Sequence, residues 1–294
     1  MPVSSDPEVA NPTPSIEESD SGAIDDGDGD DELSGAPPRD MHLASGLGVT
    51  PVMIQRSISA KRREAKGNCS DNRIQELLPF PFAPNIRPLT ISDLQSCVAL
   101  ENAAFPHPEH RATPEKFEYR LTTCPELSLG IFCTVVPDHA KDFQVETLAT
   151  AHPVETDRAD HAVSVLLAHI IATASNAEVV TDKDMSIPAG WRAAHGKKAE
   201  VGHQEGGRTV CIHSLAVAPK LHGCGLGKLI MKSYLQQINN SAAADRIALI
   251  CQDYLVSYYE RFGFKHKGES KAEFGGGGWH DMTFDFAGSD KPPN

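Results

Sequence analysis

Three glycines lie between a mostly apolar segment and a helix-like segment in the second half of the chain. Gly223, Gly225 and Gly227 follow residues 214–218, and Lys228 comes directly after the last glycine. Because glycine has no Cβ, the backbone of such a loop can approach a ligand closely. The N-terminus of the following helix adds unpaired N–H groups and the positive end of the helix dipole. The spacing predicts a turn that binds a phosphate or pyrophosphate group.

Two common phosphate loops have a different spacing. A dinucleotide-binding loop has Gly-x-Gly-x-x-Gly, whereas this chain has Gly-x-Gly-x-Gly. A Walker loop requires glycine where this chain has His222, and serine or threonine where it has Leu229. The three glycines alone also leave open a turn that binds no ligand.

Two side chains that could take part in chemistry precede this loop. Cys211 and His213 are two residues apart in an expected strand, so their side chains share one face. The ordinary pKa of histidine lies near neutral pH, which makes His213 a candidate general base; a hydrogen-bonded strand histidine is the alternative. Cys211 could carry an acyl group, but no base and acid around it can be recognised, which favours a small buried side chain.

The negative charge of the chain is concentrated at its N-terminus. Residues 1–40 contain 12 acidic residues and one basic residue, Arg39, and so carry eleven of the thirteen net negative charges. Residues 1–84 are rich in Pro, Ser, Gly and Asp and poor in aromatic residues, a composition that cannot bury enough apolar surface to fold. We therefore expect a disordered acidic tail over residues 1–84 and one folded domain over residues 85–294.

The folded part alternates between expected strands and helices. We expect helices at about 90–104, 113–122, 225–239 and 253–262, and strands at about 85–89, 127–136, 162–173, 208–217, 246–251, 264–268 and 281–286. Residues 137–160 and 176–207 are polar or glycine-rich and are expected to be surface insertions. The alternation predicts an α/β domain with a mixed sheet.

Composition excludes several classes of partner. The seven cysteines are odd in number, widely spaced and without a Cys-x-x-Cys pair, which argues against a disulfide framework or a metal site and favours a reducing compartment. No basic stripe indicates nucleic acid, and no apolar run is long enough to span a membrane. A signal peptide is not apparent. We expect a cytoplasmic protein.

Four segments carry a resemblance to a known family. The stretch from Val217-Ala-Pro219 to Gly225-Leu-Gly227 resembles the acetyl-CoA pyrophosphate loop of the GNAT acetyltransferases, usually Arg/Gln-x-x-Gly-x-Gly/Ala, with His222 in place of Arg or Gln. Cys-Pro-Glu-Leu-Ser-Leu-Gly-Ile-Phe at 124–132, Cys-Ile-His-Ser-Leu-Ala-Val at 211–217 and Cys-Gln-Asp-Tyr-Leu-Val-Ser-Tyr-Tyr-Glu-Arg-Phe-Gly-Phe at 251–264 are similar to segments of the arylalkylamine (serotonin) N-acetyltransferase branch. With residues 85–105, the resemblance covers nearly the whole domain.

The resemblance implies a fold and a cofactor. The fold would be a GNAT-type α+β domain, with a mixed, mostly antiparallel sheet of about seven strands flanked by helices. Acetyl-CoA would be the co-substrate, and no metal would be required. The residues implied to contact acetyl-CoA are Leu215, Ala216, Val217, Gly223, Cys224, Gly225, Leu226, Gly227 and Lys228.

The resemblance also implies catalytic roles. His213 matches a family histidine and would remove the proton of the amine, directly or through water, whereas Cys211 stands where the family has a second histidine. The backbone N–H of Leu215 would polarise the thioester carbonyl. Tyr259, rather than its neighbour Tyr258, matches the tyrosine that protonates the leaving thiolate.

The implied reaction is acetylation of a small primary amine. Residues 105–111 and 274–282 depart from the animal enzymes and resemble fungal-type relatives, so an arylalkylamine such as serotonin or tryptamine and a polyamine are both candidates. Three acidic residues, Glu109, Glu115 and Glu118, could attract a polycation or could form an exposed helix face. Two alternatives remain: a protein lysine or N-terminal acetyltransferase, and a silent acetyl-CoA-binding protein whose tail recruits a regulatory partner.

Overall fold

The computed structural model describes residues 74–78, 82–140, 145–154, 160–193 and 200–286. Most of the expected acidic tail, residues 1–73 and 79–81, lies outside these ranges, as does Cys69.

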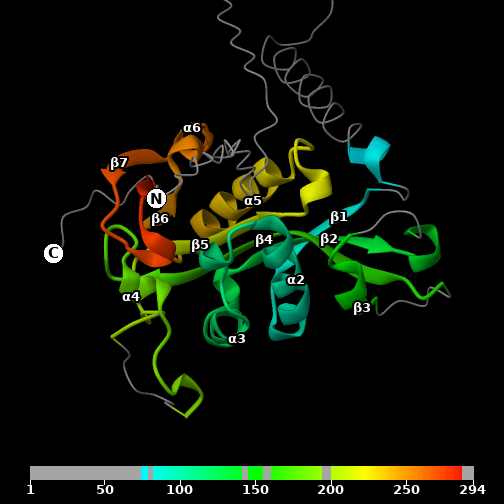
Figure 1. Ribbon diagram of the computed structural model, residues 1–294, viewed down its shortest axis with the longest axis horizontal. Helices are drawn as coiled ribbons and strands as arrows, with labels where there is room; N and C mark the ends of the chain where they lie inside the picture. The colour runs from blue at the N-terminus through cyan, green and yellow to red at the C-terminus, as the bar shows by residue number, and fades with distance from the viewer. Residues whose placement is uncertain (1–73, 79–81, 141–144, 155–159, 194–199, 287–294) are drawn as a thin grey trace, which may run out of the picture.

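A single sheet organises the described part of the chain (Figure 1). Its strand order is β1-β2-β4-β5-β6-β8-β7, with the short β3 added beside β4. Only β5 and β6 pair in parallel; the other pairs are antiparallel. The strands are β1 (Pro84–Pro88), β2 (Leu129–Val135), β3 (His152–Pro153), β4 (Val163–Ser175), β5 (Thr209–Val217), β6 (Arg246–Cys251), β7 (Lys265–Glu269) and β8 (His280–Asp285). The expected mixed and mostly antiparallel sheet is confirmed.

Helices cover both faces of the sheet. Figure 1 shows α2 and α3 against one face and α5 and α6 against the opposite face. The helices are α2 (Leu94–Ala104), α3 (Pro114–Thr123), α4 (Asp182–Met185), α5 (Leu226–Ser241) and α6 (Val256–Glu260). The start predicted for α3 is confirmed, because the Thr113 side chain accepts the N–H of Lys116 and Pro114 occupies the first helical position.

The apolar run of β4 lies in the middle of this sandwich. Leu166, Leu167, Ile170 and Ile171 are fully buried, although neighbouring residues in a strand point to opposite faces. A strand with two buried faces needs apolar residues at consecutive positions, which is why the continuous run predicted a central strand.

The folded part begins earlier than the sequence indicates. Residues 74–78, assigned above to the tail, include one helical turn whose Ile74 and Leu78 are buried in the core. A segment of five residues is too short to reveal such packing through its composition.

The two expected insertions also contribute to the fold. In residues 137–160, Val145 is buried in the core and β3 pairs with β4. In residues 176–207, α4 carries the buried Met185. Residues 141–144, 155–159 and 194–199 of these insertions lie outside the described ranges.

No helix in the ranges that the structure describes has both the length and the apolar character needed to cross a membrane.

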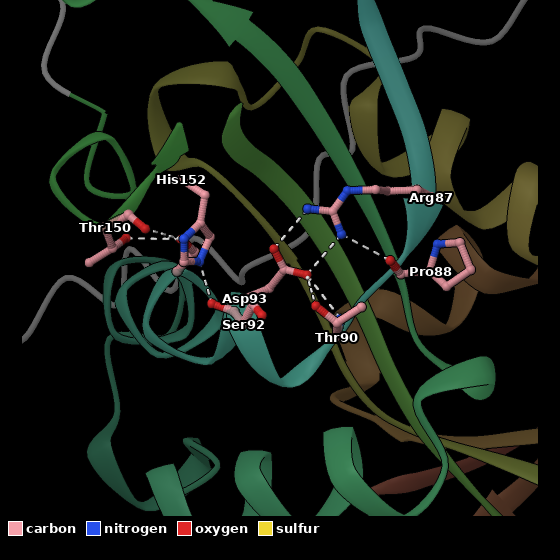
Figure 2. A network of polar contacts seen from close by, with 8 residues as sticks. Arg87, Pro88, Thr90, Ser92, Asp93, Thr150 and His152 are labelled. Atoms are coloured by element: carbon pink, nitrogen blue, oxygen red, sulfur yellow. Dashed lines mark hydrogen bonds and ion pairs between the residues drawn. The ribbon is translucent and has the colours of Figure 1, made fainter. Parts of the chain in front are cut away.

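A buried carboxylate fixes the start of α2 (Figure 2). Asp93 accepts two hydrogen bonds of 2.8 Å from the Arg87 guanidinium of β1, and its Oδ2 also accepts the N–H of Thr90 at 2.9 Å. Nearby, the His152 ring contacts the carbonyl of Ser92. Burial raises the pKa of Asp93, but the hydrogen bonds from Arg87 and Thr90 outweigh burial and leave this pKa below its ordinary value.

We expect Asp93→Asn to lower the free energy of unfolding by about 2 kcal/mol at neutral pH, because charged hydrogen bonds are lost. The folded-state pKa is depressed, so this stabilisation is complete above the unfolded pKa of about 4 and is lost as the pH falls through the folded-state value. Urea unfolding at several pH values measures the difference. A difference between wild type and variant that does not shrink in acid would contradict this assignment.

Candidate active site

The parallel strands β5 and β6 separate at the centre of the sheet. They pair over only four positions, the last of which joins Ile212 to Leu249. Beyond this point β6 continues to Cys251 paired with β8, and β5 continues to Val217 paired with β4. The two strands therefore enclose a V-shaped opening.

Backbone N–H groups of β5 face this opening. The N–H of Ala218 donates to the carbonyl of Leu167 in β4, at 2.9 Å. Successive N–H groups of a strand alternate in direction, so those of Leu215 and Val217 point away from β4 and into the opening, whereas that of Ala216 points toward β4. Two of the three strand residues expected to contact the cofactor thus present free donors on the correct side.

A β-bulge lies just before these donors. Ile171 pairs with Ser214 and Ala172 pairs with Ile212, so His213 is an extra residue in β5. A bulge bends a strand and increases its twist. It therefore contributes to the divergence of β5 from β6 and places His213 at the base of the opening.

A pocket that is partly open to solvent occupies this opening, and the roughly 750 Å³ of empty space in and above it includes solvent. It reaches from the two strands to the segments that follow α2 and precede β8. The lining residues are Phe105, Pro106, His107, His110, Met185, Ile212, His213, Ser214, Leu215, Leu249, Ile250, Cys251, Gln252, Tyr254, Leu255, Tyr259, Phe274 and Trp279.

His213, in β5, lines this cavity. Its Nε2 lies 2.8 Å from Oγ1 of the fully buried Thr173, and its Nδ1 lies 3.1 Å from the Met185 sulfur. Burial lowers the pKa of His213 well below its ordinary value, and the nearby charges of Arg120 and Lys116 lower it further. The ring is therefore neutral at pH 7.

Cys211 does not line the cavity. It is fully buried in a small apolar cluster with Val180, Met185 and Ala248. Burial raises the pKa of its thiol, and the charge of Asp184 adds to this effect. The thiol form therefore dominates at neutral pH, so the environment of Cys211 opposes a role as nucleophile and agrees with the small buried side chain favoured above.

The two neighbouring tyrosines of α6 have different environments. Tyr259 lines the cavity and packs edge-on against Phe264, with ring centroids 5.7 Å apart. Tyr258 lies outside the lining and packs against Phe262 and under the Arg261 guanidinium. Burial raises the pKa of Tyr259 well above its ordinary value, so its hydroxyl keeps its proton at any physiological pH.

The glycine loop turns the chain from β5 into α5. Gly223 and Gly225 have φ angles of 72° and 82°, in the left-handed region that favours glycine. Gly225 is the N-cap of α5, so the N–H groups of Leu226 and Gly227 lie in the first turn, where no intrahelical acceptor exists. The Lys228 side chain is exposed, and Cys224 is buried.

Aromatic side chains from the segments after α2 and before β8 form part of the cavity wall. The rings of His110 and Trp279 meet edge to face at 4.9 Å, and the Trp279 indole N–H donates to the Phe274 carbonyl at 2.6 Å. The N–H of Phe274 in turn donates to the Asp182 carboxylate in α4. In the sequence, residues 105–111 and 274–282 stand out only as departures from the family. Their contact with each other depends on the fold, and no local sequence pattern predicts it.

Two positive charges, those of Lys116 and Arg120, lie near His213. The Lys116 ammonium lies 4.8 Å from the centre of the Phe274 ring, and the Arg120 guanidinium is buried. Two of the three acidic residues suggested to attract a polycation, Glu115 and Glu118, bind Arg192 on the surface at 2.9 and 2.6 Å. The third, Glu109, is exposed and lies 3.6 Å from the ring of His107. The acidic residues of α3 therefore form an ion-paired surface rather than a cation site.

Comparison with known proteins indicates the family to which the domain is related. Residues 154–286 match the family model described as an acetyltransferase (GNAT) domain. The serotonin N-acetyltransferase of Mesocricetus auratus is 29% identical over 63% of this chain and 70% of its own length. The serotonin N-acetyltransferase of Homo sapiens is 26% identical over 51% of each chain. Among solved structures, the loading GNATL domain of CurA from Lyngbya majuscula superposes with a TM-score of 0.47 at 14% identity, over 69% of this chain and 98% of that chain.

The splayed strands and the family match define an acyltransferase that depends on acetyl-CoA. More specifically, residues 154–286 match a GNAT acetyltransferase domain. The free N–H groups of β5 and the first turn of α5 suit the amide and phosphate groups of acetyl-CoA. No group of three or more ligating side chains that could hold a metal occurs among the described residues.

We expect Gly225→Ala to weaken acetyl-CoA binding about tenfold, because alanine disfavours the left-handed conformation by about 1–2 kcal/mol and the free loop then leaves the conformation that presents the N–H groups of α5. Calorimetry with acetyl-CoA measures the affinity. Gly190→Ala is the matched control, since Gly190 also has a positive φ, of 64°, and an added Cβ there would have nothing within 4 Å. Equal loss of affinity in both variants would show that the glycine loop has no special role.

Proposed function

We propose that the protein transfers the acetyl group of acetyl-CoA to the primary amine of an arylalkylamine. The observation that supports this acceptor most strongly is the group of aromatic rings, His110, Phe274 and Trp279, in the cavity that His213 also lines. Aromatic rings bind other rings through edge-to-face and offset contacts, and they exclude water from them. The relatives named serotonin N-acetyltransferase support the same substrate class.

The charges beside the cavity favour a monoamine over a polyamine. Lys116 and Arg120 repel a second or third ammonium group, and the acidic residues of α3 are paired with Arg192. A neutral aromatic tail avoids this repulsion. A polyamine is therefore the weaker of the two acceptors in this proposal.

His213 accepts the proton of the attacking amine, directly or through water. Its Nε2 is held by Thr173, so Nδ1 is the nitrogen that faces a movable neighbour, the flexible side chain of Met185. The lowered pKa of His213 keeps the ring neutral and able to accept a proton at neutral pH.

The remaining steps use a backbone donor and a phenol. The N–H of Leu215, which faces the opening, donates to the thioester oxygen as negative charge develops there. Tyr259 donates its proton to the sulfur of the leaving coenzyme A, because its raised pKa keeps it protonated. The N–H of Val217 and the turn from Gly223 to Lys228 hold the pantetheine arm and the pyrophosphate.

We expect Tyr259→Phe to lower kcat about 100-fold with little change in the KM for acetyl-CoA, because only proton donation is removed. Tyr258→Phe is the matched control: it deletes a hydroxyl from the adjacent residue, which does not line the cavity, and should leave kcat unchanged. Steady-state kinetics with thiol detection measure both. If the two variants behave alike, Tyr259 is not the general acid.

The acceptor class is tested with tryptamine, phenylethylamine, spermine and a lysine peptide. We expect turnover on the first two, and Trp279→Ala should raise the KM for tryptamine about tenfold, as expected for the loss of about 1.4 kcal/mol of ring contact. A small alkylamine, which cannot reach the aromatic wall, serves as the control substrate for this variant. Turnover on spermine or the peptide alone would overturn the arylalkylamine proposal, and acetyl-CoA binding without any turnover would indicate a silent protein.

A further inference from the structure

Three polar side chains are buried together where α2 packs against β4 and β5. Glu101 in α2, His169 in β4 and Ser214 in β5 are 1%, 0% and 3% exposed. None of them has a role in the reaction proposed above. Buried polar groups are costly unless they are bonded, so the contacts of this cluster indicate its purpose.

The carboxylate of Glu101 joins separate segments of the chain. Its Oε1 accepts the N–H of Ala112, just before α3, at 2.9 Å, and its Oε2 accepts the hydroxyl of Ser214 at 2.6 Å. The Nε2 of His169 lies 3.1 Å from the Ser214 hydroxyl and 3.3 Å from Oε2 of Glu101. The other ring nitrogen of His169 has no hydrogen-bond partner among the described residues, so the hydrogen bonds of this ring are made through Nε2.

Ser214 is the residue through which this cluster reaches the cavity. It follows the extra residue of the bulge, His213, and precedes Leu215, whose N–H faces the opening between the strands. The backbone of a bulge is less constrained by ladder hydrogen bonds than that of a regular strand. A side-chain anchor at Ser214 therefore restricts the orientation of both neighbours.

We propose that Glu101 is a positioning residue for acetyl transfer. It holds the Ser214 hydroxyl and thereby fixes the bulge that carries the His213 ring and the Leu215 N–H. This inference rests on the roles proposed above for His213 and Leu215. The chain continues from α2 into Phe105 and His107, which line the cavity. The same carboxylate therefore also fixes the position of these two residues relative to β5.

A carboxylate suits this position because it only accepts hydrogen bonds. The N–H of Ala112, the Ser214 hydroxyl and Nε2 of His169 all converge on it. In Glu101→Gln the oxygen can still accept from Ala112, but the amide N–H₂ then faces Ser214 and reverses the polarity of that contact. The variant keeps the shape of the side chain and removes the anchor of the bulge.

The test compares Glu101→Gln with Asp93→Asn, its matched control. Both replace a buried carboxylate of the α2 region by its amide, but Asp93 lies at the N-terminal end and contacts Arg87 and Thr90 rather than β5. We expect Glu101→Gln to lower kcat about 100-fold, the loss typical of a small misplacement of reacting groups, with acetyl-CoA affinity unchanged. Asp93→Asn should retain kcat below its unfolding temperature. An equal loss of kcat in both variants would overturn the proposal.

A double-mutant cycle tests whether the effect passes through Ser214. If Glu101 acts by holding Ser214, then Ser214→Ala lowers kcat to a similar extent and the double variant is no worse than either single variant. Independent, multiplicative losses would contradict the proposed route.

A third measurement separates this proposal from the assignment of His213. The side-chain ¹H–¹⁵N resonances of His213 should shift in Glu101→Gln and stay unchanged in Asp93→Asn, whatever the activity. Unchanged His213 resonances in Glu101→Gln would overturn the positioning role. If His213→Ala retains full kcat while the His213 resonances shift in Glu101→Gln, His213 is not the base. The link from Glu101 through Ser214 to His213 would then still hold.

Discussion

The separation of β5 from β6 is the constraint on which the site depends. The two parallel strands share only four paired positions, and the extra residue at His213 bends β5 immediately after the last pair. The N–H groups of Leu215 and Val217 consequently have no partner strand and become donors for a ligand. A regular parallel pair would satisfy these donors internally and would leave no cavity between the strands.

The surroundings of the opening decide what chemistry it supports. The positive charges of Lys116 and Arg120 and the burial of His213 act in the same direction, and together they keep the imidazole neutral. Burial lowers the pKa of the Arg120 guanidinium to about 10, so it remains charged at neutral pH and its repulsion persists. In the function proposed above, the same charges that keep the base neutral also repel polycationic acceptors. One electrostatic arrangement thus bears on both catalysis and substrate choice.

The sequence predicted most of the elements because their signals are local. The consecutive apolar residues of β4, the Thr113-Pro114 start of α3 and the glycines before α5 each act within a few positions. Other features depend on contacts between distant segments and left no such signal. The bulge at His213 is a matter of register against β4, the burial of Met185 depends on how residues 176–207 fold back, and the hydrogen bonds of Glu101 reach Ser214 across 113 positions. The pairing of Glu115 and Glu118 with Arg192 is equally remote in sequence.

Residue-resolved hydrogen exchange, with and without acetyl-CoA, tests the central claim most directly. We expect acetyl-CoA to slow the exchange of the Leu215 and Val217 amides, which face the opening. The amides of Ala216 and Ala218 face β4 and should exchange slowly in both states. Protection that appears equally at all four amides, or at none of them, would contradict the account.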